Sequence, residues 1–161
     1  MKVLAVKARK KMIKVSLTEQ IIKSAVAVLK RGGVIAYPTE TAYGLGCDPR
    51  KAKAVAKIFR IKGRGKNKPL LLVAASVAQV RRLVRLPTTN YQLLTKYWPG
   101  PLTLVLPVKK GAWHAPLHKS IAPHGEIAIR FSSSPFVQEL CRAYGFPIVS
   151  TSANRSGEPE T

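Results

Sequence analysis

The sequence predicts one α/β domain in which helices flank a mixed β-sheet. Helix-like and strand-like segments alternate along the chain, which is the pattern of a layered sheet with helices on its faces. The segments 102–108 and 127–131 follow one another as strands with no helix between them, which favours an antiparallel step in an otherwise alternating order. With 161 residues and 46% hydrophobic content, the chain has enough apolar surface for one core and no room for a second domain.

A first helix is predicted over residues 17–31. Ser16 and Glu19 have the spacing of a capping box, and apolar residues recur at helical intervals until Gly32 ends the pattern. The short apolar run at 34–37, bounded by glycine and proline, then predicts a buried strand.

A polar loop is predicted over residues 39–47, with a second helix after it. Asp48 and Pro49 suit the N-cap and the first helical position of that helix. Four apolar residues at helical spacing are expected to form its buried side: Ala52, Val55, Ala56 and Phe59.

Turn and cap residues divide the rest of the chain, which begins with a basic loop at 62–68. The predicted strands are 70–74, 102–108, 127–131 and 147–151, and the predicted helices are 76–84, 89–98 and one from Ser133 or Ser134 to about 144. The stretch 109–125, which holds all three histidines, is expected to be irregular.

The charge is unusual, because 28 Lys and Arg face only 7 Asp and Glu, a formal net charge of +21. Such an excess predicts a polyanionic partner, and tRNA or double-stranded RNA is the natural candidate; a generally basic proteome or a solubility adaptation is the alternative explanation of the charge. The cations are dense in an N-terminal arm, residues 1–15, and between 50 and 68. No apolar run of membrane-spanning length and no signal-peptide pattern is present, so we expect a cytoplasmic protein with no membrane partner. Cys47 and Cys141 are expected to be reduced.

Three segments combine polar side chains with glycine. Residues 37–46 carry hydroxyls and a carboxylate beside glycines that we take to be flexible, residues 62–69 carry four cations, and residues 150–157 offer hydroxyls and an amide after a strand. The first segment suits a small polar ligand, and the second suits a phosphate or a carboxylate. The third suits phosphate oxygens. Each also fits a plain turn or a solvated basic loop.

Metal and covalent chemistry have little support in the sequence. Seven carboxylates make a protein metal cage improbable, whereas Mg²⁺ carried by nucleotide phosphates needs few protein ligands. His114 and His118 are four residues apart, but Pro116 between them argues against a shared helical face and a zinc site. No Ser or Cys nucleophile has a recognisable His partner.

The motifs, taken together, resemble the YrdC-like threonylcarbamoyl-AMP synthase family over residues 16–161. The most specific matches are Tyr37 to Gly46, Lys62-x-Arg64 with Lys68-Pro69-Leu70, Trp98 to Thr103, Ala128-Ile129-Arg130, and Ser152-Ala153-Asn154 with Ser156-Gly157. This resemblance implies a twisted mixed sheet with a concave basic face. It also implies a nucleotidyltransferase that converts L-threonine, bicarbonate and ATP, with Mg²⁺, into threonylcarbamoyl-AMP and pyrophosphate.

The resemblance also implies roles for individual residues. These are catalysis by Lys62 and Arg64, threonine binding by Thr41, Lys62 and Ser152, and ATP binding by Arg64, Lys68, Ser152 and Asn154. The product is expected to pass to partner proteins that form threonylcarbamoyladenosine (t6A) in tRNA.

Two departures from the family pattern qualify this expectation. Gly65 replaces the usual proline, and the family continues past the Ser-Ala-Asn loop into further structure, so we expect a C-terminally shortened member or a fragment. The alternative is a non-catalytic RNA-binding or ribosome-maturation module of the same fold. Carbamoyl-adenylate chemistry of the hydrogenase-maturation type is a third reading, which the absence of the associated acylphosphatase and zinc-finger segments disfavours.

Overall fold

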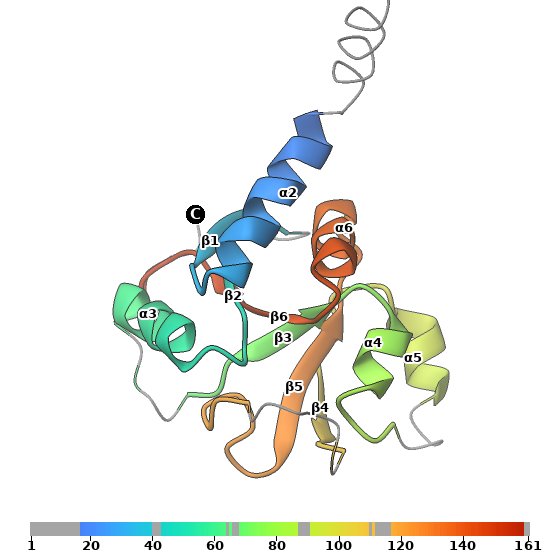
Figure 1. Cartoon of the computed structure of the whole chain (residues 1–161). Coiled ribbons are helices and arrows are strands. Elements are labelled where there is room, and N and C mark those ends of the chain that lie inside the picture. Colours follow the sequence, from blue (N-terminus) through green and yellow to red (C-terminus); the bar gives the residue numbers. More distant parts are fainter. Residues whose placement is uncertain are drawn as a thin grey trace, which may run out of the picture.

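The protein folds around one six-stranded sheet with the strand order β1-β2-β6-β3-β5-β4 (Figure 1). The computed structural model describes residues 17–39, 43–63, 65, 68–86, 91–109, 111 and 117–159. The strands are β1 (Ile35–Pro38), β2 (Tyr43–Cys47), β3 (Leu71–Ala74), β4 (Leu104–Pro107), β5 (Glu126–Phe131) and β6 (Ile148–Ser152). The helices are α2 (Leu17–Lys30), α3 (Ala52–Lys62), α4 (Val77–Arg81), α5 (Tyr91–Tyr97) and α6 (Pro135–Tyr144).

The sheet is mixed, which confirms the expected fold class. Strands β3 and β5 are parallel, whereas β1 with β2, β2 with β6, β6 with β3, and β5 with β4 are antiparallel. The antiparallel β4–β5 pair is the hairpin-like step that the sequence indicated. Strand β6 lies between β2 and β3, so the last described strand joins the two halves of the sheet.

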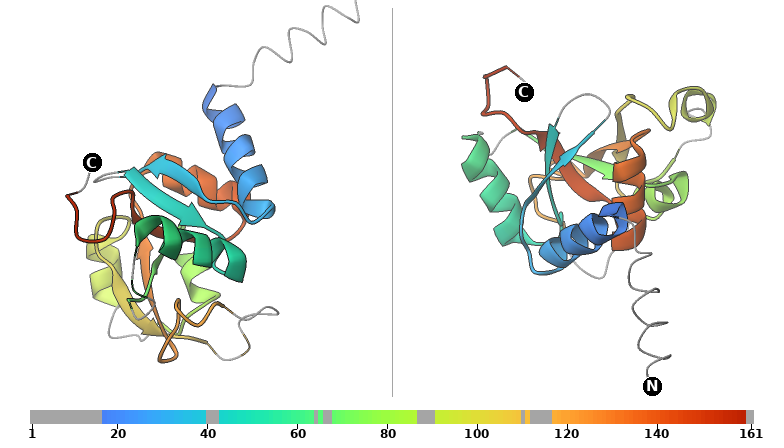
Figure 2. Two further views of the ribbon diagram at one scale, coloured as in Figure 1. Left: turned by 90° about the vertical axis from the view of Figure 1, so that its left-hand side faces the viewer. Right: turned by 90° about the horizontal axis from the view of Figure 1, so that it is seen from above.

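The two faces of the sheet carry separate cores because alternate strand residues point to opposite sides. Helices α2 and α6 lie side by side over one face, where Val73 and Ile148 pack against Leu29 and Leu140 (Figure 2). On the other face, residues of α3, α4 and α5 join a larger cluster; its fully buried members include Ile58, Leu72, Val80 and Ile129.

Short polar side chains begin two of the helices as the sequence predicted. The Ser76 hydroxyl accepts a hydrogen bond from the Gln79 N–H, and the Ser134 hydroxyl accepts one from the Val137 N–H. Gly145 ends α6 at a φ of 78°, a left-handed conformation that glycine adopts without strain. None of the helices in the described ranges is long and apolar enough to span a membrane.

The predicted loop at 39–47 is wrong in its second half, because residues 43–47 form β2. Glycine is rare in strands, so Gly44 and Gly46 gave this segment a low strand propensity, and the sequence predicted a loop where β2 forms. Neither glycine has a positive φ, and their role is therefore not the flexibility we expected of them. It is the close approach of a neighbouring side chain, described with the site below.

The predicted cap of the second helix is also wrong, because Lys51 is the N-cap residue of α3. The Asp48 carboxylate instead accepts hydrogen bonds from the backbone N–H and the guanidinium of Arg50 and from the Tyr144 hydroxyl. Asp48 is only 1% exposed, and a buried carboxylate requires such partners.

The buried side of α3 is rotated relative to the prediction. Val55 and Phe59 are buried as expected, but Ala52 and Ala56 are exposed, and their places in the core are taken by Ala54 and Ile58. Both cysteines are free, as expected, and both are buried. Burial raises the pKa of the Cys47 and Cys141 thiols to about 12, so both stay protonated.

Candidate active site

The last turn of α3 meets the loop that follows β6. Lys62 is only 2% exposed, and its Nζ lies 2.5 Å from the carbonyl oxygen of Ser152 and 2.7 Å from that of Asn154. The side-chain oxygens of the same two residues lie 3.5 and 3.3 Å from Nζ. One buried ammonium therefore faces four oxygens, an arrangement that offsets the cost of removing the charge from water.

Backbone hydrogen bonds fix the same loop from two further sides. The Ser156 N–H donates to the Lys62 carbonyl at 2.9 Å, and the Ala153 N–H donates to the Tyr43 carbonyl at 2.9 Å. The Asn154 amide also donates to the carbonyl of Glu158. The Ser-Ala-Asn loop is thus attached both to the end of α3 and to the start of β2.

Strand register places the loop at the end of a polar strip on the sheet. The side chains of cross-strand partners point to the same face of a sheet. Tyr37 of β1 is paired with Gly44 of β2, and Gly44 is paired on its other side with Ser152 of β6. In the adjacent row Gly46 is paired with Ser150. The Tyr37 hydroxyl donates to Ser150 Oγ at 2.8 Å. Hydroxyl groups from β1 and β6 therefore share the face that α2 and α6 partly cover.

Glycine in β2 makes room for the Tyr37 ring. A Cβ atom on Gly46 would lie 2.7 Å from Tyr37 Cε1 and 2.9 Å from the Val149 carbonyl oxygen, distances that real Cβ atoms essentially never show. Tyr37 is 1% exposed and stacks on Phe136 of α6, with 6.4 Å between the ring centroids. The glycines of the 37–46 motif thus shape the strip beside the loop.

Two other motif segments meet each other on the β4–β5 side of the sheet. Arg130 Nε donates to Thr103 Oγ1 at 3.1 Å, and the Gly100 N–H donates to the Phe131 carbonyl at 2.9 Å. Arg130 is paired with Val73, whose side chain packs under α6. Arg130 therefore lies on the same face as Ser150 and Ser152, and we add it to the candidate site.

The structure brings together three of the six predicted site residues, namely Lys62, Ser152 and Asn154. Lys68 is exposed on the segment before β3, where its N–H donates to the Gly65 carbonyl at 3.2 Å. Thr41 and Arg64 lie outside the described residues. The Tyr43 carbonyl and Arg130 were not predicted as site residues, although both belong to motifs that the sequence displays.

In the described part of the chain, no group of three His, Cys, Asp or Glu side chains is placed to hold a metal ion. Asp48 is committed to Arg50 and Tyr144, whose hydrogen bonds outweigh the effect of burial and lower the pKa of its carboxyl group. The arrangement is a buried ammonium bonded to the Ser-Ala-Asn loop, with hydroxyl and amide groups beside it.

The sequence profile of the Sua5/YciO/YrdC family, described as "Telomere recombination", matches residues 27–161. The chain belongs to this family. The threonylcarbamoyl-AMP synthase of Stenotrophomonas maltophilia strain K279a is 47% identical over 146 residues, which are 88% of this chain and 75% of that protein. The synthase of Hahella chejuensis strain KCTC 2396 is 46% identical over 134 residues, or 83% and 71% of the two chains.

Solved structures of this family share the fold. P. abyssi Sua5 complexed with L-threonine superposes with a TM-score of 0.78 at 35% identity, over 86% of this chain. This chain spans 40% of the length of that Sua5 chain. E. coli YciO superposes with a TM-score of 0.72 at 28% identity, over 83% of this chain and 63% of YciO. The mixed sheet is therefore the fold of the family.

Proposed function

We propose that this protein is a threonylcarbamoyl-AMP synthase. The observation that supports the proposal is the contact of Lys62 with Ser152 and Asn154, because it joins the basic motif and the Ser-Ala-Asn motif in one site. Curated relatives named for this activity, and a Sua5 structure that holds L-threonine, favour the synthase over a non-catalytic RNA-binding module.

The proposed reaction has two steps. The amino group of L-threonine attacks the carbon of bicarbonate, and loss of water gives a carbamate. A carbamate oxygen then attacks the α-phosphorus of ATP, the bond from that phosphorus to the bridging oxygen breaks, and pyrophosphate leaves. Negative charge gathers on the phosphoryl oxygens, so positioned reactants and fixed cations suffice without a protein nucleophile.

Residue roles follow from this chemistry as part of the proposal. Lys62 supplies the fixed positive charge and holds the carbonyls of Ser152 and Asn154, so that the loop presents its polar groups in one geometry. Arg64 and Lys68 bind phosphate oxygens, and Thr41 and Ser152 bind threonine. Asn154 completes the nucleotide side of the site.

Mg²⁺ and the downstream steps belong to the same proposal. The sparse carboxylates fit an ion that arrives on the triphosphate, where it neutralises phosphate charge. We expect the product to supply the proteins that form t6A in tRNA, in the cytoplasm, and the net charge of +21 to favour contact with RNA.

The test is pyrophosphate release from ATP, measured with and without L-threonine and bicarbonate. The synthase requires both, and release that is independent of threonine would refute the proposal. Lys62→Ala is expected to lower turnover by at least about a hundredfold, the loss typical of one fixed electrostatic group. Lys57→Ala, an exposed lysine on the same helix, is the matched control and is expected to retain full turnover.

A further inference from the structure

Two sequence motifs to which the proposed reaction assigns no role, Trp98 to Thr103 and Ala128 to Arg130, meet where β5 pairs with the edge strand β4. Arg130 Nε donates a hydrogen bond to Thr103 Oγ1 at 3.1 Å. The antiparallel register of β4 and β5 places these two residues opposite each other, just before β4 begins. The bond therefore joins the side chains of two neighbouring chain segments across the sheet.

The loop that carries the acceptor is fixed on both sides of this contact. Trp98 is only 7% exposed, and its indole Nε1 donates to the Leu102 carbonyl at 2.7 Å. The Gly100 N–H donates to the Phe131 carbonyl at 2.9 Å. A Cβ atom on Gly100 would clash with the Tyr97 carbonyl oxygen, so the turn that makes this bond requires glycine. The residues next to the contact are therefore held in place on both segments.

The guanidinium of Arg130 belongs to the face of the sheet that carries the candidate active site. Arg130 is paired with Val73, and Val73 is paired with Ile148, which precedes Ser150 by two residues on β6. Side chains related in this way point to the same face. The guanidinium is planar, so a bond that holds Nε also fixes the plane and the direction of the two Nη groups.

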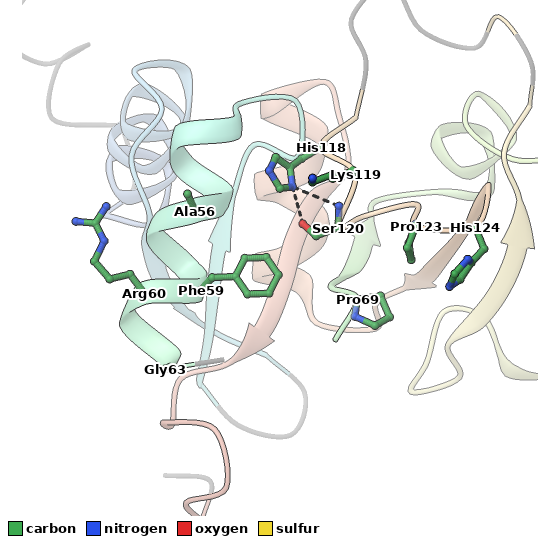
Figure 3. Close-up of a pocket in the computed structure, with 10 residues that line it drawn as sticks. All are labelled: Ala56, Phe59, Arg60, Gly63, Pro69, His118, Lys119, Ser120, Pro123 and His124. Atoms are coloured by element: carbon green, nitrogen blue, oxygen red, sulfur yellow. Dashed lines mark hydrogen bonds between the residues drawn. The ribbon is translucent and has the colours of Figure 1, made fainter. Parts of the chain in front are cut away.

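Arg60 of α3 is a contrasting arginine. It belongs to the lining of a pocket of about 940 Å³ between α3 and the segment 117–125. In Figure 3, however, its guanidinium lies on the side of α3 away from Phe59, which points towards the pocket. Arg60 is exposed, whereas Arg130 is half-buried and bonded to the neighbouring segment. A position beside a cavity therefore does not direct a guanidinium by itself, and at Arg130 the Thr103 hydroxyl supplies the direction.

We propose that Thr103 is a positioning residue, which orients the Arg130 guanidinium to bind an oxyanion of a substrate. A carboxylate and a phosphate both present paired oxygens that match the fork of a guanidinium. Both groups occur in the reactants of the synthase, L-threonine and ATP, so the inference rests on the proposed function for the identity of the ligand. Thr103 acts through Nε of Arg130 and has no contact of its own with the reactants.

The experiment measures binding of L-threonine and of ATP, each by calorimetric titration, so that it does not depend on turnover. Thr103→Val removes the acceptor and is expected to weaken binding of one ligand at least about threefold, whereas Thr103→Ser keeps the hydroxyl and should stay within about twofold of the parent. Weaker binding of L-threonine alone identifies the carboxylate, and weaker binding of ATP alone identifies the phosphate. Unchanged binding of both ligands, or equal weakening of both, overturns the inference.

A double-variant cycle tests whether Thr103 acts through Arg130. Arg130→Lys keeps the charge but loses the planar fork, and it is expected to weaken the same ligand at least about tenfold. The double variant should then bind no more weakly than Arg130→Lys alone, because the bond to Thr103 is already lost. Additive losses overturn the inference. Thr95→Val is the matched control, since it removes a hydroxyl that donates to the Gln92 carbonyl at 3.1 Å on α5, and it should leave binding unchanged.

The proton on Arg130 Nε gives a readout that does not need a ligand. Its NMR signal is identified by its absence from Arg130→Lys. Exchange of this proton with water is expected to be about fivefold faster in Thr103→Val, which lacks the acceptor, and unchanged in Thr103→Ser. Equal exchange rates in the parent and in Thr103→Val would show that Thr103 does not hold the guanidinium and would overturn the inference.

The positioning role and the synthase activity fail separately. If the parent binds L-threonine or ATP but its pyrophosphate release does not depend on L-threonine, only the synthase proposal fails, and the cycle of Thr103 and Arg130 is still measured by ligand binding. If Thr103→Val binds both ligands and releases pyrophosphate as the parent does, only the positioning role fails.

Discussion

Replacing Gly46 with alanine tests whether the glycines of the 37–46 motif make room for Tyr37. The added Cβ would lie 2.7 Å from Tyr37 Cε1 and 2.9 Å from the Val149 carbonyl oxygen. The carbonyl belongs to the neighbouring strand and the ring is buried under α6, so neither moves without disturbing packing. Overpacking of this kind costs about 1–3 kcal/mol. In a domain of this size each kcal/mol lowers Tm by about 2–4 °C.

Gly44→Ala is the matched control two residues away on the same strand. There the nearest atom is the Thr39 methyl group at 3.1 Å, followed by Tyr37 Cζ at 3.4 Å and Ser150 Oγ at 3.6 Å. Small side-chain adjustments relieve such contacts, so we expect a loss below about 1 kcal/mol. Thermal and urea unfolding measure both variants. Equal stability of Gly46→Ala and the parent, or equal losses in the two variants, would refute the reasoning.

Two further predictions concern hydrogen bonds. Tyr37→Phe removes the hydroxyl that donates to Ser150, and urea unfolding is expected to show a loss of about 1 kcal/mol, most of which should disappear in a Ser150→Ala background. Asp48 has a lowered pKa, so its stabilising contribution is present above about pH 4 and is lost as the pH falls through the folded-state value. Asp48→Asn should therefore lower the free energy of unfolding by about 2 kcal/mol at pH 7. It should also reduce the drop in the urea unfolding midpoint between pH 6 and pH 3, and an unchanged drop would contradict this assignment.

Local patterns were sufficient for most of the fold. The predicted helix at 17–31 and the helix from Ser134 were confirmed as α2 and α6, because amphipathic spacing and, for α6, a side-chain cap act within a few residues. The predicted cap residue of α2, Ser16, lies outside the described residues. Strand β2 was missed because glycine has a low strand propensity, and propensity does not record the close approach of Tyr37 that leaves no room for a Cβ at Gly46. Asp48 followed by proline fits a helix N-cap equally well, and only the folded chain brings Tyr144 to the carboxylate.

The candidate site depends on contacts between distant parts of the chain. Lys62 and Ser152 are 90 residues apart, so spacing alone cannot place one beside the other. The resemblance to the family implied that both residues belong to one site. In the structure they lie together because the Lys62 ammonium donates hydrogen bonds to the carbonyls of Ser152 and Asn154. The pocket between α3 and the 117–125 segment was not predicted, because that segment lacks periodicity and is positioned by single bonds to Pro49 and Leu70.

The position of β6 has a consequence for the order of folding. Strand β2 has only β1 and β6 as neighbours, and β3 has only β5 and β6, so the hairpin β1–β2 and the β3–β5–β4 unit stay unconnected until β6 is inserted. Pairings that close such long loops are slow to form. We therefore expect the insertion of β6 to be a late step of folding. Because β6 also carries Ser150 and Ser152, the strand that completes the sheet is the one that brings these side chains to the candidate active site.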